Sequence, residues 1–600
     1  MVFTLTILWN GFNSCLLCGA YWVYTHGMAS LQAVRAHGRV YWRIVESRRV
    51  NGKPRPVPIE YLGKTADILA RLQGTEALRV RSLSHGAVAA LFSMSQELGI
   101  AGAIDRQLAE HGRRLRPSQL RRNESTAPKK HDGLTVGQSL VLVAIGRACC
   151  ATSKRAFAEW AKTTSLGHLA GVDLERLTSQ HFWDQMDQLP VELIEAIERD
   201  LIAEVVQRFQ LPLDTLLYDA TNFFTFIAST NERCKLPARG KQKQKRNDLR
   251  QVGVALLCSR QHGIPLWHRT YGGNVADANC FSQVLSSLKQ RIVDLRRNIE
   301  FLTIIYDKGN VSRANQRQVD ASKLHYVSAL TVASQRKLVD EANLLLLPVE
   351  IDADETVLAY RTKRKVWGAE RTVVVVVSER LREGQMAGVI QHVAKAQEWF
   401  SGQADTLRRG QQRRDRARIE RDIENYLKGR QHLGEVLRFK LTGEDPHLTL
   451  TYEFDRAAFD ALAQSTFGRL VLMTDRHDWP TAEIIRAYHG QSAIEAVFAH
   501  LKDPNHIALR PQRHWTDQKL HVHVFTCVLG YLLARLLLLR VRQANSPHAS
   551  VESLLEALAK IRRVTVIRRA SESSKPRLST QLEDLAPEEL RLMEALKIDA

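Results

Sequence analysis

Several familiar metal- and nucleotide-binding patterns are missing from this 600-residue sequence. No Gly-rich loop precedes a Lys-Ser or Lys-Thr pair, so the sequence offers no P-loop for a nucleotide. The eight cysteines are scattered, and the one Cys-x-x-Cys pair, Cys15 and Cys18, has no second pair at zinc-finger spacing. His and Cys together form no cluster with zinc spacing either. A reduced cytosolic protein with buried thiols is the simplest interpretation.

The sequence also lacks notable repeats, low-complexity tracts and a clear helix-turn-helix glycine pattern. Residues 1–27 are apolar, but polar residues interrupt them and no basic segment precedes them. They therefore make a poor signal peptide and a marginal membrane anchor. We interpret residues 1–27 as an upstream extension, with Met28 as the working start and no membrane partner. A membrane anchor is the alternative.

Positive charge, in contrast, is abundant. Lys and Arg number 85 against 64 Asp and Glu, which gives a net charge of +21. This excess suits a polyanionic partner such as nucleic acid, although net charge alone does not exclude an anionic membrane surface. With 44% hydrophobic and 25% charged residues the chain is globular, and its length predicts two to four domains.

The N-terminal third of the chain predicts a hairpin followed by helices. Residues 40–62 alternate in polarity around an Asn51–Gly52 turn, which predicts a two-stranded β-hairpin. Residues 81–205 show helical periodicity, interrupted by a basic linker at 113–133. This helical region either binds DNA ends or is a plain helical bundle. The sequence favours neither interpretation over the other.

From Leu211 the pattern changes to strands that end in acidic residues. We interpret LPLDTLLYDATNFFTFI as a strand, Asp219, a polar turn and a second strand. Two more strands, a helix through Ile292 and the strand FLTIIYDKGN with Asp307 follow. Three antiparallel strands, a helix and then strand–helix–strand is the order expected of an RNase H-like α/β core. The basic loop beside the first acid contains Lys241, Lys243, Lys245 and Arg246.

A mixed, strand-containing insertion interrupts this core before a final strand and helix rejoin it. The arginines between Arg408 and Arg421 either lie on a solvated helix face or contact phosphates. The predicted fold class is thus α/β, an RNase H-like catalytic core with a β-rich or mixed insertion, preceded by a helical N-terminal DNA-binding region. In chain order, the predicted segments are the extension 1–27, the hairpin segment 28–80, the helical DNA-binding region 81–205, the first part of the core 211–345, the insertion 346–465, the second part of the core 466–545 and the tail 546–600.

The segment Trp479–Lys502 predicts one amphipathic helix. Tyr488, Gln491, Glu495 and Lys502 recur in it at separations of three, four and seven. They should therefore project within roughly 60° of one another on an α-helix, beside an apolar stripe. The alternative is an ordinary surface helix, with Tyr488 packed and Lys502 solvated.

Asp219, Asp307 and Glu495 together indicate metal-assisted chemistry on phosphodiesters. Two divalent ions roughly 4 Å apart activate the nucleophile and stabilise the leaving oxygen of such a reaction. Mg²⁺ prefers hard oxygen ligands and keeps several waters, so a few carboxylates suffice. His521 and His523 are a second candidate metal pair, but on an apolar helix they fit a core or DNA-facing role better.

These segments resemble a known family, the bacterial insertion-sequence transposases of the DDE class with the Tyr-x2-Arg-x3-Glu-x6-Lys signature. Tyr488, Glu495 and Lys502 match that signature, and Gln491 replaces its arginine. The stretches YDATNFF around Asp219, GNVAD at 273–277 and YDKGNVSRAN at 306–315 are similar to the segments that carry the first two acids. RPQRHWTDQKLHVHV is similar to the segment that follows the glutamate. The resemblance spans 28 to about 565.

The resemblance implies an RNase H-like fold and cut-and-paste transposition at terminal inverted repeats. It implies that Asp219, Asp307 and Glu495 are catalytic and hold two Mg²⁺ ions, for which Mn²⁺ can substitute. Tyr488 and Lys502, with the basic loop, would bind DNA; the missing guanidinium at Gln491 predicts a weaker phosphate contact there. The implied partners are double-stranded inverted repeats, target DNA and a second copy in a homodimeric synapse, in the bacterial cytoplasm at the nucleoid.

Two other functions stay open on the sequence. A metal-dependent, structure-specific nuclease would share the acids but would not join strands. A non-catalytic DNA-binding relic of a transposase would bind ends without cutting or joining them, although the presence of all three acids argues against decay.

Overall fold

The structure, a computed structural model, divides into two compact units that are described separately. The smaller unit comprises Met1–Ala90, Glu159–Gly171 and Ala544–Ala600, and the larger comprises Leu91–Ala158 and Val172–Gln543. The residues that the structure describes are 4–5, 29–50, 53–73, 77–115, 130–240, 248–294, 301–409, 415–430, 432–444, 447–510, 512–545, 548, 550–569 and 577–598.

In the smaller unit, one sheet has the order β1-β2-β3-β4. Its strands β3 and β4 pair antiparallel and form the hairpin predicted for residues 40–62, although the turn at 51–52 lies outside the described residues. The sequence patterns predicted no strand before this hairpin, but β2 pairs with β3 and widens the sheet. The bounds are β1 Thr4–Leu5, β2 Ala29–Ala36, β3 Arg39–Val50, β4 Lys53–Gly63 and helix α1 Thr65–Leu72.

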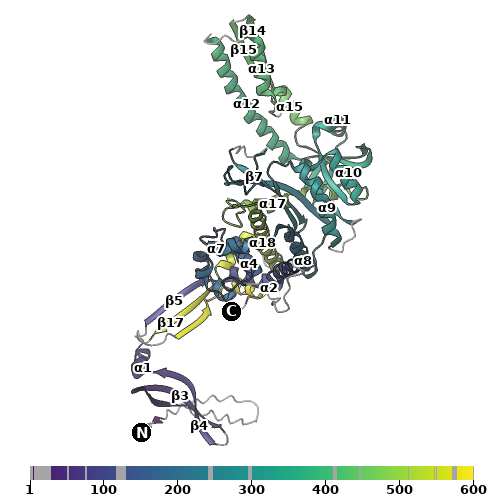
Figure 1. Cartoon of the computed structure of the whole chain (residues 1–600). Helices are drawn as coiled ribbons and strands as arrows, with labels where there is room; N and C mark the ends of the chain where they lie inside the picture. The colour runs from purple at the N-terminus through teal and green to yellow at the C-terminus, as the bar shows by residue number, and fades with distance from the viewer. Residues whose placement is uncertain are drawn as a thin grey trace. The chain divides into compact units, whose positions relative to one another are not determined.

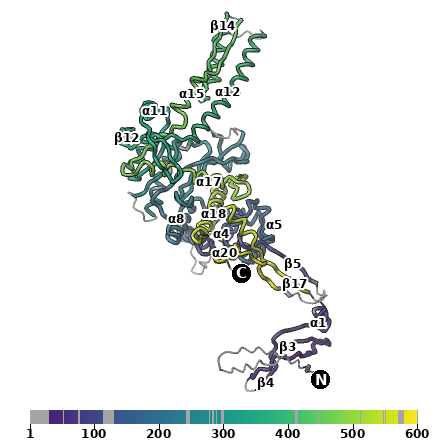
Figure 2. Tube along the Cα trace, turned by 180° about the vertical axis from the view of Figure 1, so that it is seen from behind, coloured from purple at the N-terminus to yellow at the C-terminus, as the bar shows by residue number. Residues whose placement is uncertain are grey.

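The C-terminal segment of this unit is folded, and its strands join a strand from the N-terminal part of the chain. β17 (Arg562–Arg569) pairs antiparallel with both β5 (Ala77–Ser84) and β18 (Arg577–Leu582). Figures 1 and 2 both show β5 and β17 side by side. The predicted tail is therefore part of a sheet. Helices α6 (Leu166–Ala170), α19 (Val551–Ala559) and α20 (Pro587–Leu596) complete the unit.

Helices surround one long apolar helix in the larger unit. α18 (Asp517–Gln543) is long and apolar enough to cross a membrane by length and composition, but 94% of that stretch is buried inside the protein. It packs against α4 (Val136–Cys149), and both views show the two together. α18 is thus a core helix. The other helices before the sheet are α2 Gly86–Glu97, which begins in the smaller unit, α3 Ile100–Leu115, α5 Phe157–Ala161, α7 Ser179–Asp187 and α8 Val191–Phe209.

A nine-stranded sheet forms the centre of the larger unit, in the order β11-β12-β13-β16-β10-β9-β6-β7-β8. β6, β7 and β8 are antiparallel neighbours, whereas β9 runs parallel to both β6 and β10. This confirms the predicted order of three antiparallel strands, a helix and strand–helix–strand. The bounds are β6 Thr215–Thr225, β7 Arg250–Ser259, β8 Pro265–Gly272, α9 Asp277–Asp294, β9 Thr303–Tyr306, α10 Arg313–Ser322, β10 His325–Leu330, α11 Arg336–Asn343 and β16 Arg469–Thr474.

The prediction that a turn follows Asp219 is wrong. β6 continues without a break to Thr225, because residues 219–225 keep antiparallel pairing with β7. The parallel pairing of β6 with β9, however, is recorded only as far as Tyr218. Asp219 therefore lies within a strand but at the point where one of its two neighbouring strands ends.

The predicted insertion is divided between the central sheet and a separate layer. Its first strands, β11 (Leu347–Asp352), β12 (Glu355–Val366) and β13 (Ala369–Val377), extend the sheet, with β13 paired to β16. The remainder has its own hydrophobic cluster around Phe400, and α12 lies along β15 (Figure 1). Its elements are α12 Glu379–Arg408, α13 Arg416–Leu427, α14 Leu433–Val436, β14 Leu437–Glu444, β15 His447–Phe454 and α15 Arg456–Ser465.

Candidate active site

Two of the predicted acids lie on adjacent parallel strands. Tyr218 of β6 is the register partner of Tyr306 of β9, and Asp219 and Asp307 are the next residues of the two strands. Neighbouring strands are about 4.8 Å apart, so the register makes the two aspartates neighbours at the same edge. Both are partly buried. The apolar strands that precede them, which are buried on both faces, fix this edge in place.

Tyr488 connects all three acids. Its hydroxyl donates a hydrogen bond to Oδ1 of Asp307 over 3.0 Å. Burial is the largest cause that raises the pKa of Tyr488 well above its ordinary value, and the negative charges of Asp307, Glu495 and Asp219 add to it. Three carboxylates that the chain separates by up to 276 residues, the difference between positions 219 and 495, thus lie near enough to one neutral phenol to raise its pKa.

The segment Trp479–Lys502 is not one helix, as the spacing predicted. It consists of α16 (Thr481–His489) and α17 (Gln491–Lys502), which meet at Gly490. Gln491 is only 8% exposed, and its Nε2 has no hydrogen-bond partner among the described residues. Glu495, one turn later, is exposed. The two residues share one face of α17, but only Glu495 is open to solvent.

α17 is held against β6 by contacts of two residues that follow Glu495. The rings of Phe498 and Phe223 are 6.5 Å apart between centroids. Nζ of Lys502 donates to Oγ1 of Thr221 over 2.8 Å and lies 5.4 Å from the centre of the Phe223 ring. Thr221 is two residues after Asp219, so both side chains point to the same face of the sheet. This face carries one acid from the strand and one cation from the helix.

Thr221 is a site residue that the sequence argument missed. Its position two residues after Asp219 in a strand was the available signal, but the prediction of a polar turn directly after Asp219 concealed it. The basic loop residues Lys241, Lys243, Lys245 and Arg246 lie outside the described residues. His523 is 3% exposed and contacts the carbonyl oxygen of Leu509 through Nε2 over 3.1 Å. It belongs to the core, as its place on an apolar helix indicated.

The three acids fit divalent metal ions by the chemistry of their donors. Asp219, Asp307 and Glu495 offer only carboxylate oxygens, which suit Mg²⁺ and other hard cations. Glu495 has no hydrogen-bond or ion-pair partner among the described residues, so its carboxylate oxygens are available. Asp307 receives one hydrogen bond at Oδ1, which leaves the lone pairs of Oδ2 available.

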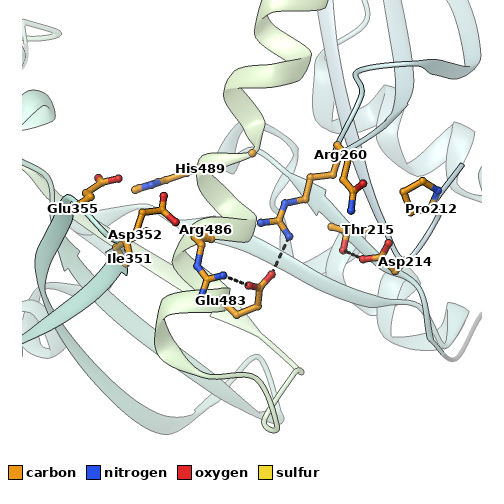
Figure 3. Close-up of a pocket in the computed structure, with 12 residues that line it drawn as sticks. Pro212, Asp214, Thr215, Arg260, Ile351, Asp352, Glu355, Glu483, Arg486 and His489 are labelled. Carbon is orange, nitrogen blue, oxygen red and sulfur yellow. Dashed lines mark hydrogen bonds and ion pairs between the residues drawn. The ribbon is translucent and has the colours of Figure 1, made fainter. Parts of the chain in front are cut away.

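A polar pocket lies at the other end of β6 (Figure 3). Asp214 and Thr215 line it at the start of the strand, four or more residues before Asp219. Four residues of extended strand span about 13 Å. Glu483 pairs here with Arg260 over 2.9 Å and with Arg486, its neighbour on α16, over 3.0 Å. The Glu483 carboxylate is therefore neutralised by arginines of the protein. The distance along β6 makes this pocket separate from the three-acid site.

Comparisons with solved structures give transposases with low similarity. A piggyBac transposase synaptic complex with hairpin DNA aligns with 8% identity and a TM-score of 0.36, covering 80% of this chain and 82% of that one. A Mos1 transposase paired-end complex with a left transposon end aligns with 11% identity and a TM-score of 0.14, covering 39% and 77%. A pre-cleavage Mos1 transpososome gives 10% identity, the same TM-score and the same coverage. No curated protein matches the chain.

The sequence itself matches a family model over more than half of its length. The model is described as the transposase DDE domain, and it covers residues 215–533. This range begins at the first residue of β6 and ends within α18, so it contains Asp219, Asp307 and Glu495. The chain is a member of the DDE transposase family, the enzymes that cleave DNA and transfer its strands.

Proposed function

We propose that this transposase excises and inserts a bacterial insertion sequence by a cut-and-paste reaction at terminal inverted repeats. Asp219, Asp307 and Glu495 are its catalytic residues and hold two Mg²⁺ ions. The observation that carries this proposal is that Tyr488 donates a hydrogen bond to Asp307 and that the charges of Asp307, Glu495 and Asp219 all raise its pKa. Without the fold, nothing would bring these acids to one place.

The bound Mg²⁺ ions would activate the attacking oxygen and stabilise the leaving oxygen. The chain's residues set the geometry. β6 and β9 bring two carboxylates side by side, and α17 carries the third. The Tyr488 hydroxyl orients the Asp307 carboxylate through Oδ1 and stays protonated, because its pKa is raised. Water attack at the 3′ end of the element frees a 3′-hydroxyl, which then attacks target DNA in line.

Lys502 is the residue of this site best suited to bind a DNA phosphate. Lys502 follows Glu495 by seven residues on α17. The hydrogen bond to Thr221 positions its ammonium group beside β6. Lys acts as a point charge on phosphate rather than as a bidentate fork. The net charge of +21 favours a polyanionic partner for the whole chain. We further propose a homodimer that pairs two transposon ends, at the nucleoid of the bacterial cytoplasm.

The test is cleavage of DNA that carries the inverted repeats flanking the gene, with Mg²⁺ and with EDTA. Asp219→Asn, Asp307→Asn and Glu495→Gln should each abolish cleavage and strand joining and leave end binding largely intact. Asp214→Asn is the matched control, because Asp214 is an exposed acid at the other end of β6.

Two results would overturn parts of the proposal. Full cleavage by the Asp307→Asn protein in Mg²⁺ would refute the ligand assignment. Cleavage by the wild type without joining of a pre-cut end would indicate a structure-specific nuclease instead of a cut-and-paste transposase.

A further inference from the structure

A second group of metal-ligating side chains lies outside the three-acid site. His131 and Asp132 belong to a tight turn before α4, closed by hydrogen bonds between the backbones of His131 and Leu134. Asp132 has a φ of 51°, which is in the left-handed region. His181 comes from α7 and its side chain is fully buried. None of these residues belongs to β6, β9 or α17.

Three potential ligand atoms converge at one point. Nδ1 of His131 and Nδ1 of His181 are 3.1 Å apart. Each lies 3.0 Å from Oδ2 of Asp132. A zinc ion bound at about 2.0–2.1 Å, with angles of about 90–110°, needs ligand atoms about 2.9–3.4 Å apart. All three separations fall within this range.

The contact between Nε2 of His181 and Ser139 determines the tautomer of the ring, and therefore whether Nδ1 presents a lone pair to the cluster. The Ser139 hydroxyl donates its one proton to the carbonyl oxygen of Thr135 over 2.9 Å. Ser139 Oγ, 3.0 Å from Nε2 of His181, must then accept a proton from that nitrogen. Nδ1 of the neutral ring is left as an acceptor, aimed at a carboxylate oxygen. Two acceptors at hydrogen-bond distance repel each other unless a proton or a metal ion lies between them, and a third ligand nitrogen, Nδ1 of His131, faces the same point.

We propose that His131, Asp132 and His181 bind one divalent transition-metal ion, with zinc the best fit. Two imidazole nitrogens and one carboxylate oxygen are a ligand set of zinc, whereas Mg²⁺ prefers oxygen ligands alone. The His131 side chain is 47% exposed, so a water can complete the coordination. The ion would tie the turn before α4 to α7. This site is additional to the proposed catalytic metals and does not depend on them.

Ser139 is a positioning residue in this proposal. A group that accepts the second ring N–H of a metal-bound histidine fixes its tautomer and orientation. Removing such a group typically weakens metal binding about 10- to 100-fold. Ser139→Ala should therefore weaken zinc binding by that factor, whereas loss of Asp132 or His131 should abolish it.

The experiment uses the full-length protein, purified without a metal-affinity step and dialysed against a metal-free buffer. Zinc affinity is measured by competition with a chromophoric chelator, and Co²⁺ is added separately to record its visible absorption. The variants are Asp132→Asn and His131→Gln, which change partly exposed side chains, and Ser139→Ala. Circular dichroism checks that each folds. His447→Gln, which changes an exposed histidine of β15, is the control.

The expected result is one zinc ion per chain in the wild type and in the control, with no binding by the two ligand variants. Excess Mg²⁺ should not displace the zinc, and the Asp307→Asn protein should bind it as the wild type does. A wild type that binds no zinc, or an Asp132→Asn protein that binds it with unchanged affinity, overturns the proposal. Zinc lost in the Asp307→Asn protein would also overturn it, because the ion would then belong to the three-acid site.

Discussion

The hydroxyl of Tyr488 donates a hydrogen bond to Oδ1 of Asp307 over 3.0 Å, and this contact joins α16 to the end of β9. It makes Tyr488 a residue that orients a carboxylate, a role that its place in the sequence signature did not reveal. The sequence argument assigned Tyr488 to phosphate binding. In this structure its hydroxyl proton is used within the protein, and its oxygen lone pairs face a region of negative charge.

Tyr488→Phe should slow DNA cleavage while preserving end binding. A hydrogen bond to a charged group contributes about 1.5–3 kcal/mol, which is about 10- to 100-fold in rate if it acts wholly on the reaction. Single-turnover cleavage and gel-shift assays measure the two properties. The matched control is Tyr360→Phe, which removes a similar tyrosine–carboxylate contact of 2.7 Å to Glu341, away from the acids. Equal rates for Tyr488→Phe and wild type would show that the contact has no role in catalysis.

The stability of the folded chain should fall at high pH. Burial raises the pKa of Tyr218, Tyr306, Tyr326 and Tyr488 in the folded state. Unfolded tyrosines titrate near pH 10, so above about that pH the unfolded chain loses protons that the folded chain retains. The free energy of unfolding then decreases by up to about 1.4 kcal/mol per pH unit for each tyrosine.

Urea unfolding at about pH 9, 10 and 11 measures this effect around the ordinary tyrosine pKa. Tyr218→Phe removes one of these buried hydroxyls, and it should make the decrease shallower. An unchanged free energy of unfolding over this range would contradict the prediction.

Lys502→Ala should weaken binding to transposon ends and reduce its salt dependence. Losing one phosphate contact lowers the slope of log affinity against log salt by about 0.9. Binding titrations at several salt concentrations measure the slope. Lys337→Ala, an exposed lysine of α11, serves as the control and should leave the slope unchanged. A slope for Lys502→Ala equal to that of the control would place Lys502 away from the DNA.

Gly273→Ala should destabilise the larger unit far more than Gly272→Ala. A Cβ at Gly273 would lie 1.8 Å from the backbone oxygen of Gln251 and 2.9 Å from that of Ala238, and neither backbone can easily move. At Gly272 the nearest atom, 3.1 Å away, is in the side chain of Asn274. Overpacking costs about 1–3 kcal/mol, and backbone obstacles favour the upper end. Thermal unfolding of both variants measures the difference, and similar losses would refute the steric explanation.

The sequence by itself determined the central strands and their order. Apolar runs bounded by turn residues predicted β7, β8, β9 and β10, and Ser312 caps α10 where the helix was expected to start. These elements were predictable because burial on both faces leaves a continuous apolar signal. The identity of the three acids rested on the same local patterns together with a family resemblance, and their roles stay predictions.

Only the tertiary structure decided how distant segments combine. β6 continues past Asp219 because β7 pairs with it, and local polarity carries no information about a partner strand. Gly490 divides the predicted helix into α16 and α17, and within α17 the tertiary packing buries Gln491 while Glu495, one turn later, stays exposed. The convergence of His131 and His181 has no local signal at all, since the two are 50 positions apart in the chain. Contacts between residues far apart in sequence depend on packing, and spacing along the chain does not record them.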